Sequence, residues 1–104
     1  MKKIVINACY GGFGLSKLAT ESYASRKGLN PGKWNEAFRF YDGISDRSIP
    51  RDDKDLIEIV ESLGTLANGW AADLKIVEIP DEVDWEIAEY DGFEHVAEKH
   101  RTWS

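Results

Sequence analysis

Apolar and polar positions along the chain predict elements in the order β-α-β-α-β-β-β. Residues Lys3 to Cys9 are predicted to form a buried strand, because Ile4-Val5-Ile6 is too apolar for a strand exposed on both faces. A helix is expected to follow, starting at Ser16 or at the turn around Gly14, running to about Lys27 and stopping at Gly28. Its apolar positions share one face and are Leu15, Leu18, Ala19 and Tyr23.

A second helix has the clearest pattern in the chain. Acidic residues precede it, where they complement the helix dipole, at Asp52, Asp53 and Asp55. Apolar residues then repeat on one face at Leu56, Ile59, Val60, Leu63 and Ala67. Asn68-Gly69 supplies the expected stop, so we expect this helix to pack against the core.

The remaining elements are predicted strands. Trp34 to Tyr41 is rich in aromatics, Asp42 to Pro50 is polar and irregular, and Leu74 to Ile79 is a strand closed by Pro80. Asp91-Gly92 predicts a hairpin between Asp84–Tyr90 and Phe93–Trp103. In that register Tyr90 faces Phe93 and Ile87 faces Val96, and a helix from Glu94 to His100 is the competing assignment.

Together these elements predict an α+β fold, a single domain over residues 1–104 with a mixed sheet and two helices. The net charge of −6 argues against a nucleic-acid polymer as partner, because such binding requires many basic contacts to phosphates. No run is long enough to span a membrane, and the single cysteine excludes a disulfide framework. We therefore expect a cytoplasmic protein.

The glycine-rich segment between the first strand and the first helix is the main candidate site. Glycines allow close approach of the backbone, and the start of a helix leaves N–H groups for an anion such as phosphate. The phosphate side is expected at Gly11, Gly12, Phe13, Gly14 and Ser16, with Tyr10 beside it for stacking on a base. Lys17 stands where a dinucleotide fingerprint needs its third glycine, and the order of a Walker loop is absent. The alternative is a tight turn that holds no ligand.

Basic and aromatic residues elsewhere could complete the site. Arg101 or Arg51 is the expected charge partner of a phosphate, and Trp103 is a second stacking candidate. Because one small domain offers only a shallow pocket, we expect a homo-oligomer if a nucleotide is to be enclosed. We expect no cofactor and no metal, and the acidic residues from Glu78 to Glu98 are read as a solvated hairpin face.

The chain resembles a group of small bacteriophage and prophage proteins without an assigned function. The resemblance is carried by Ile4–Ser16, Ile49–Asp53, Leu74–Pro80, Glu89–Gly92 and Glu98–Trp103, and is weakest over residues 28–48. It implies a phage accessory role. Through size, context and loop chemistry it extends to anti-defence sponges, which hold nucleotide second messengers such as cyclic ADP-ribose isomers or cyclic oligonucleotides without cleaving them.

The leading hypothesis is therefore a binding protein that sequesters a phosphate-containing nucleotide second messenger in the host cytoplasm. One alternative is a small hydrolase or lyase that uses Cys9 as nucleophile with His95 or His100 as base, or a His and a carboxylate as acid and base. Another is an inhibitor that docks on a host protein through the acidic hairpin and aromatic residues. Cys9 is also read as a small buried apolar residue, which would leave it no chemical role.

Overall fold

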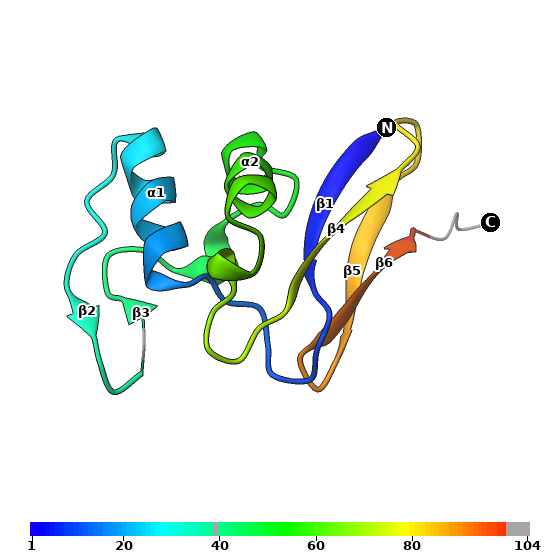
Figure 1. The fold of residues 1–104 in the computed structure, drawn as a ribbon. Helices are drawn as coiled ribbons and strands as arrows, with labels where there is room; N and C mark the ends of the chain where they lie inside the picture. The colour runs from blue at the N-terminus through cyan, green and yellow to red at the C-terminus, as the bar shows by residue number, and fades with distance from the viewer. Residues whose placement is uncertain (39, 100–104) are drawn as a thin grey trace.

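The molecule is elongated, 49 × 28 × 25 Å, with two neighbouring helices between a short hairpin at one end and the longer strands at the other (Figure 1). The computed structural model describes residues 1–38 and 40–99, and within these it has two α-helices, two 3₁₀ turns and six strands. The α+β class with two helices is thus confirmed. Neither helix in the described part of the chain is long and apolar enough to cross a bilayer.

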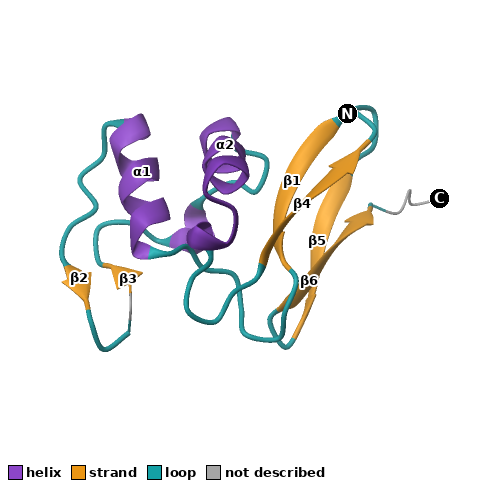
Figure 2. Cartoon of the chain, viewed as in Figure 1, coloured by secondary structure: helices purple, strands orange, loops and turns teal. Residues whose placement is uncertain are grey.

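The central sheet consists of β1 (Lys2–Asn7) and β4 (Leu74–Ile79), which pair antiparallel. On one side of it α2 (Lys54–Leu63) contacts both strands, and α1 (Lys17–Lys27) packs on α2. On the other side lies the hairpin of β5 (Trp85–Tyr90) and β6 (Phe93–Glu98), with β6 against β1 (Figure 2). β1 therefore lies between two layers, as its apolar sequence predicts.

The core lies between the helices and the central sheet. Its members are buried and come from β1, both helices and the loops beside them: Val5, Leu15, Ala19, Tyr23, Ile49, Leu56, Ile59, Val60 and Ala67. Ile4 and Ile6 are also buried, and alternation along the strand directs them to the face opposite Val5.

The strands do not form the single mixed sheet that the sequence predicts. All described pairings are antiparallel and give three two-stranded sheets. The outer edge of β1 is occupied, because the amide of Val5 donates to the carbonyl of Arg51 (2.8 Å) and that of Asn7 donates to the Glu94 carboxylate (2.8 Å). With that edge taken, β6 contacts β1 without joining its ladder.

Both helices form where the sequence predicts them. Ser16 caps α1 by accepting a hydrogen bond from the amide of Ala19, and Gly28 ends it in a left-handed conformation (φ 68°). Leu18 was expected on the buried face but is 48% exposed. The second predicted helix is shorter than expected, because α2 gives way at Leu63 to a 3₁₀ turn over Gly64–Ala67.

The aromatic segment from Trp34 to Tyr41 is not one strand. It forms a short hairpin of β2 (Trp34–Asn35) and β3 (Phe40–Tyr41), in which the side chain of Asn35 accepts from the amide of Phe38. A 3₁₀ turn over Asp46–Ser48 and the buried Ile49 follow in the region expected to be irregular.

The C-terminal hairpin has the predicted register. Tyr90 pairs with Phe93 and Ile87 pairs with Val96. The turn needs positive φ at two successive residues, which Asp91 (φ 50°) and Gly92 (φ 86°) provide. The competing helix from Glu94 to His100 is wrong over residues 94–98, which form β6, while His100 lies outside the described residues.

Acidification is expected to weaken the fold through Asp53, the residue that caps α2. Burial acts to raise the pKa of this carboxyl, but hydrogen bonds from Lys27, backbone amides and Tyr23 outweigh it and lower the pKa from 3.8. The lowered pKa makes the ionised Asp53 stabilising above pH 3.8, and this contribution is lost as pH falls below that value. Urea unfolding between pH 2 and 7 measures this effect: the free energy of unfolding should fall less with acidification in Asp53→Asn than in the wild type. An equal fall in the two proteins would contradict a stabilising role for ionised Asp53.

Candidate functional site

The glycine-rich loop lies between β1 and α1, against residues 69–71. A Cβ at Gly11 would come within 1.7 Å of the carbonyl oxygen of Ala71, so glycine is required there by packing inside the fold. Gly12 has φ 133°, a conformation that side chains disfavour. Gly14 has neither constraint, since its nearest neighbour would be the Asp46 carboxylate at 3.8 Å. The fold itself therefore requires glycine at two of these three positions, 11 and 12, but not at position 14.

The backbone amides of this segment fall into two groups. Those of residues 10–14 donate no hydrogen bond to any described residue. The next two amides are used inside the fold: Leu15 N donates to Asp46 Oδ2 (3.1 Å) and Ser16 N donates to the Ala67 carbonyl (2.9 Å). Residues 10–14 thus offer amide donors for an anion, whereas the amides of Leu15 and Ser16 do not.

The phosphate-binding role expected for the Ser16 hydroxyl is not supported. This hydroxyl donates to the carbonyl of Leu66 (2.6 Å) and accepts from the amide of Ala19 (3.1 Å). Its hydrogen is therefore committed to the connection between α1 and the 3₁₀ turn after α2. The serine is a helix cap, which is the commonest role of serine at this position.

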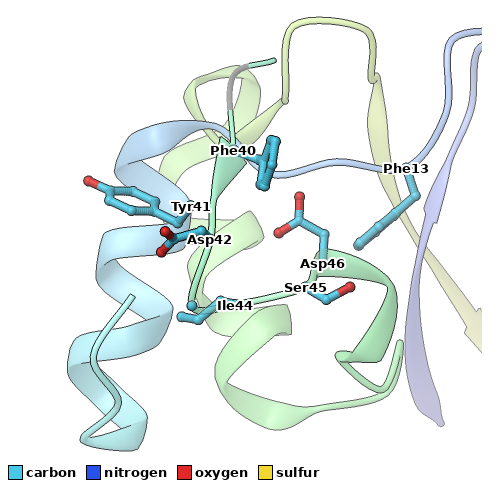
Figure 3. A pocket seen from close by; sticks show the side chains of 8 residues that line it. Phe13, Phe40, Tyr41, Asp42, Ile44, Ser45 and Asp46 are labelled. Atoms are coloured by element: carbon cyan, nitrogen blue, oxygen red, sulfur yellow. The ribbon is translucent and has the colours of Figure 1, made fainter. Parts of the chain in front are cut away.

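A hollow of about 520 Å³, here called the Asp46 cleft, opens beside the loop (Figure 3). It is lined by Phe13, Phe40, Tyr41, Asp42, Gly43, Ile44, Ser45 and Asp46. The rings of Phe40 and Phe13 stand on either side of the Asp46 carboxylate. A second hollow of about 250 Å³ shares Phe13, Phe40 and Asp46 with the cleft and continues along Gly11, Gly12 and Gly14. The two hollows therefore adjoin at Phe13, Phe40 and Asp46, and together they are here called the depression.

Large aromatic side chains border this depression and are open to solvent. Phe38 is 71% exposed, Trp70 is 75% exposed and Phe40 is 43% exposed, and all three line the hollow along the glycine loop. Such a concentration of exposed rings is typical of a binding surface. Their flat faces suit a planar ligand.

Asp46 is the most unusual group in the cleft. Burial raises the pKa of its carboxyl above the ordinary value, and the hydrogen bond from the Leu15 amide opposes that rise. Leu15 holds one carboxylate oxygen in place. A positioned, poorly solvated carboxylate between two rings is an acceptor for N–H groups of a ligand.

Arg51 lies beside the loop, as the sequence hypothesis needs, but it is already engaged. Its guanidinium covers the ring of Phe13, with Cζ 3.5 Å from the centroid. It also forms a bidentate pair with Glu94, at 2.5 Å and 2.9 Å, and Glu94 is buried. Arg51 and Glu94 line a further hollow of about 470 Å³ on the other side of the loop. Arg51 therefore orients Phe13 and neutralises Glu94.

The other predicted site residues are not brought to the cleft. Tyr10 packs on Phe93 of the hairpin, with ring centroids 5.2 Å apart, and lines none of the hollows described above. Arg101 and Trp103 lie outside the described residues, so their expected roles stay predictions.

Asn7, at the end of β1, holds the loop in place. Its side chain donates to the carbonyls of Cys9 (2.9 Å) and Gly92 (2.7 Å), and it accepts from the amide of Asp73 (2.8 Å). The residue is fully buried. One side chain thus connects the glycine loop, the hairpin turn and the approach to β4.

The geometry around Cys9 does not resemble a nucleophile and base. Its Sγ contacts Asn7 Oδ1 and the carbonyl of Ala71, both at 3.3 Å. His95 is exposed on β6, on the face opposite the inward-pointing Glu94. Among the described residues there is also no group of three or more His, Cys, Asp or Glu side chains placed to hold a metal ion.

Sequence reasoning missed Asn7, Asp46 and Trp70, and it assigned Glu94 to a solvated hairpin face although this side chain is buried. One signal was present, since Asn7 is a polar residue directly after the Ile4–Ile6 run, where only a satisfied amide can be buried. Nothing local marks Asp46 or Trp70, because their neighbours at the site are distant in sequence.

The protein is thus a small α+β domain with an open, aromatic-lined depression along a glycine-rich loop. Comparison of the chain with protein-family models, with curated proteins and with solved structures finds no match in any of the three.

Proposed function

We propose that this protein binds a phosphate-containing nucleotide and holds it without cleaving it. The observation that supports the proposal most is the coincidence of two features in one depression. Backbone amides of residues 11–14 have no partner among the described residues, and exposed aromatic rings border the hollow that these residues line. Amides are donors for phosphate oxygens, and rings stack on a base.

The phosphate would lie over Gly11 and Gly12, away from Asp46, because a carboxylate repels an anion. The amides there are neutral donors, so the site does not need a basic cluster in a chain of net charge −6. Lys17 supplies a positive charge at the rim, where it lines a small hollow with Trp34 and Trp70. This division places anion and base at opposite ends of the depression.

A holding function without catalysis agrees with the chemistry of the depression. Its lining residues provide stacking surfaces, amides and two carboxylates, those of Asp42 and Asp46, and the single thiol is engaged by Asn7 and Ala71. The resemblance to phage proteins extends the proposal to a nucleotide second messenger of the cyclic ADP-ribose or cyclic oligonucleotide type, sequestered in the host cytoplasm. Because the depression is open, a second copy of the chain would complete its wall, which supports a homo-oligomer.

Gly14→Ala is expected to reduce ligand affinity while leaving the fold intact. The added methyl has no neighbour closer than 3.8 Å, so it occupies space in the hollow and not in the core. Overpacking a filled site costs about 1 to 3 kcal/mol, which is a loss of about 5- to 140-fold in affinity. Calorimetric titration with cyclic ADP-ribose and cyclic dinucleotides measures it, and saturating ligand should also raise the Tm of the wild type.

Ser62→Ala is the matched control, because Ser62 is exposed on α2 and lines none of the hollows described above. The bound nucleotide should be recovered intact after heat denaturation, as mass spectrometry will show. Recovery of a converted product would instead support the hydrolase or lyase hypothesis. Failure of these nucleotides to bind the wild type, or equal affinities for wild type and Gly14→Ala, would contradict the proposed site.

A further inference from the structure

We propose that the Asp46 cleft selects a guanine base, with the Asp46 carboxylate accepting hydrogen bonds from its Watson–Crick edge. This inference rests on the proposed function and narrows it to guanine-containing nucleotides. It is carried by the arrangement of Phe13, Phe40 and Asp46.

The cleft presents the rings of Phe13 and Phe40 and the carboxylate of Asp46 to a planar base. Phe13 and Phe40 flank the carboxylate, so a flat ring system between them would direct its edge at Asp46 (Figure 3). The guanidinium of Arg51 packs on the ring of Phe13, with Cζ 3.5 Å from the ring centroid, and so holds this ring in position. The volume of about 520 Å³ lies within the range of small-ligand sites.

The carboxylate distinguishes the bases by the pattern of donors and acceptors. Leu15 N–H occupies one acceptor position on Oδ2, and an ionised carboxylate has several more. Guanine presents two adjacent N–H donors, from N1 and from the 2-amino group, which a carboxylate accepts together. Adenine and cytosine each place a ring-nitrogen acceptor next to their amino group, and this acceptor would be repelled by the second oxygen. A carboxylate in this position therefore favours guanine.

The position of the cleft relative to the loop agrees with a nucleotide. Phe13, Phe40 and Asp46 line both the cleft and the hollow that follows Gly11 to Gly14. A base held at Asp46 thus leaves its sugar and phosphate to extend toward the unpaired amides. Burial raises the pKa of the Asp46 carboxyl, and a hydrogen bond to a partly buried group is stronger than one in water.

The test is calorimetric titration of three proteins, the wild type, Asp46→Asn and Asp42→Asn, with guanosine monophosphate and with adenosine monophosphate. The measured quantity is the affinity of each protein for each nucleotide. The wild type should bind the guanosine nucleotide at least tenfold more tightly. Asp46→Asn keeps an oxygen for the Leu15 amide but offers one acceptor and one donor, so the preference should disappear or reverse toward adenosine. Asp42→Asn removes the same charge from the same cleft, and its oxygen can still accept from Lys33 N, so the guanosine preference should remain.

The outcomes separate this inference from the proposed function. Equal binding of the two nucleotides by the wild type overturns the guanine assignment and leaves nucleotide binding standing. Equal loss of preference in both variants also overturns it, because it would show an effect of cleft charge alone. If neither monophosphate nor the cyclic nucleotides bind the wild type, both proposals fail.

Discussion

Arg51→Met should destabilise the fold by about 3 to 5 kcal/mol, the cost of breaking a buried ion pair by removing one partner. Glu94 is 6% exposed and both of its oxygens contact the Arg51 guanidinium. Without the arginine, a buried carboxylate would keep only the amide of Asn7 as a partner. Methionine preserves most of the apolar volume against Phe13, so the loss of stability measures the effect of removing the positive charge.

Chemical denaturation of the purified variant measures this effect. The double variant Arg51→Met/Glu94→Gln should recover most of the stability, because glutamine removes the charge but still offers an oxygen to Asn7 N. A loss below about 1 kcal/mol in the single variant, the size typical of a surface ion pair, would show that the pair is solvated.

Asn7→Asp is expected to be the other severe substitution, although the two side chains have nearly the same shape. The aspartate would lose both donors and place an acceptor against the carbonyls of Cys9 and Gly92 in a fully buried position. Each unsatisfied buried polar group costs about 1 to 3 kcal/mol, and charge adds to this. We expect a total loss of about 3 kcal/mol or more.

Asn35→Asp is the matched control for this substitution. The Asn35 side chain only accepts, from the amide of Phe38, so an aspartate can keep the same bond. Urea unfolding should separate the two variants clearly, and hydrogen exchange at the amide of Asp73 should accelerate only in Asn7→Asp. Comparable stabilities of the two variants would show that the hydrogen bonds around Asn7 contribute little to the free energy of unfolding.

Local patterns were sufficient to predict the helices and the hairpin. Ser16 and Gly28 delimit α1 through capping, and Asp91-Gly92 sets the register of β5 and β6, because each signal acts within a few residues. The joining of strands into sheets was not predictable in this way. It depends on Arg51 and Glu94 meeting the outer edge of β1 from distant parts of the chain.

The candidate site was predicted only in part, because local sequence signals reveal its loop but not its contacts with distant residues. The loop from Gly11 to Gly14 was identified because glycine clusters are visible in sequence, yet Gly11 is required by contact with Ala71, which composition does not reveal. Asp46 reaches the loop through a hydrogen bond to Leu15, a pairing across 31 positions. Side chains that line a cavity from separate elements have no shared periodicity, so the cleft emerged only from the fold.

The engagement of the β1 edge by Arg51 and Glu94 has a consequence for solubility. An open strand edge that carries Ile4, Val5 and Ile6 would be a template for cross-β aggregation between molecules. Here two side chains and one carbonyl occupy that edge at Val5 and Asn7, and such groups cannot propagate a ladder as another strand would. The ion pair therefore protects β1, the most apolar strand of the chain, from pairing with strands of other molecules.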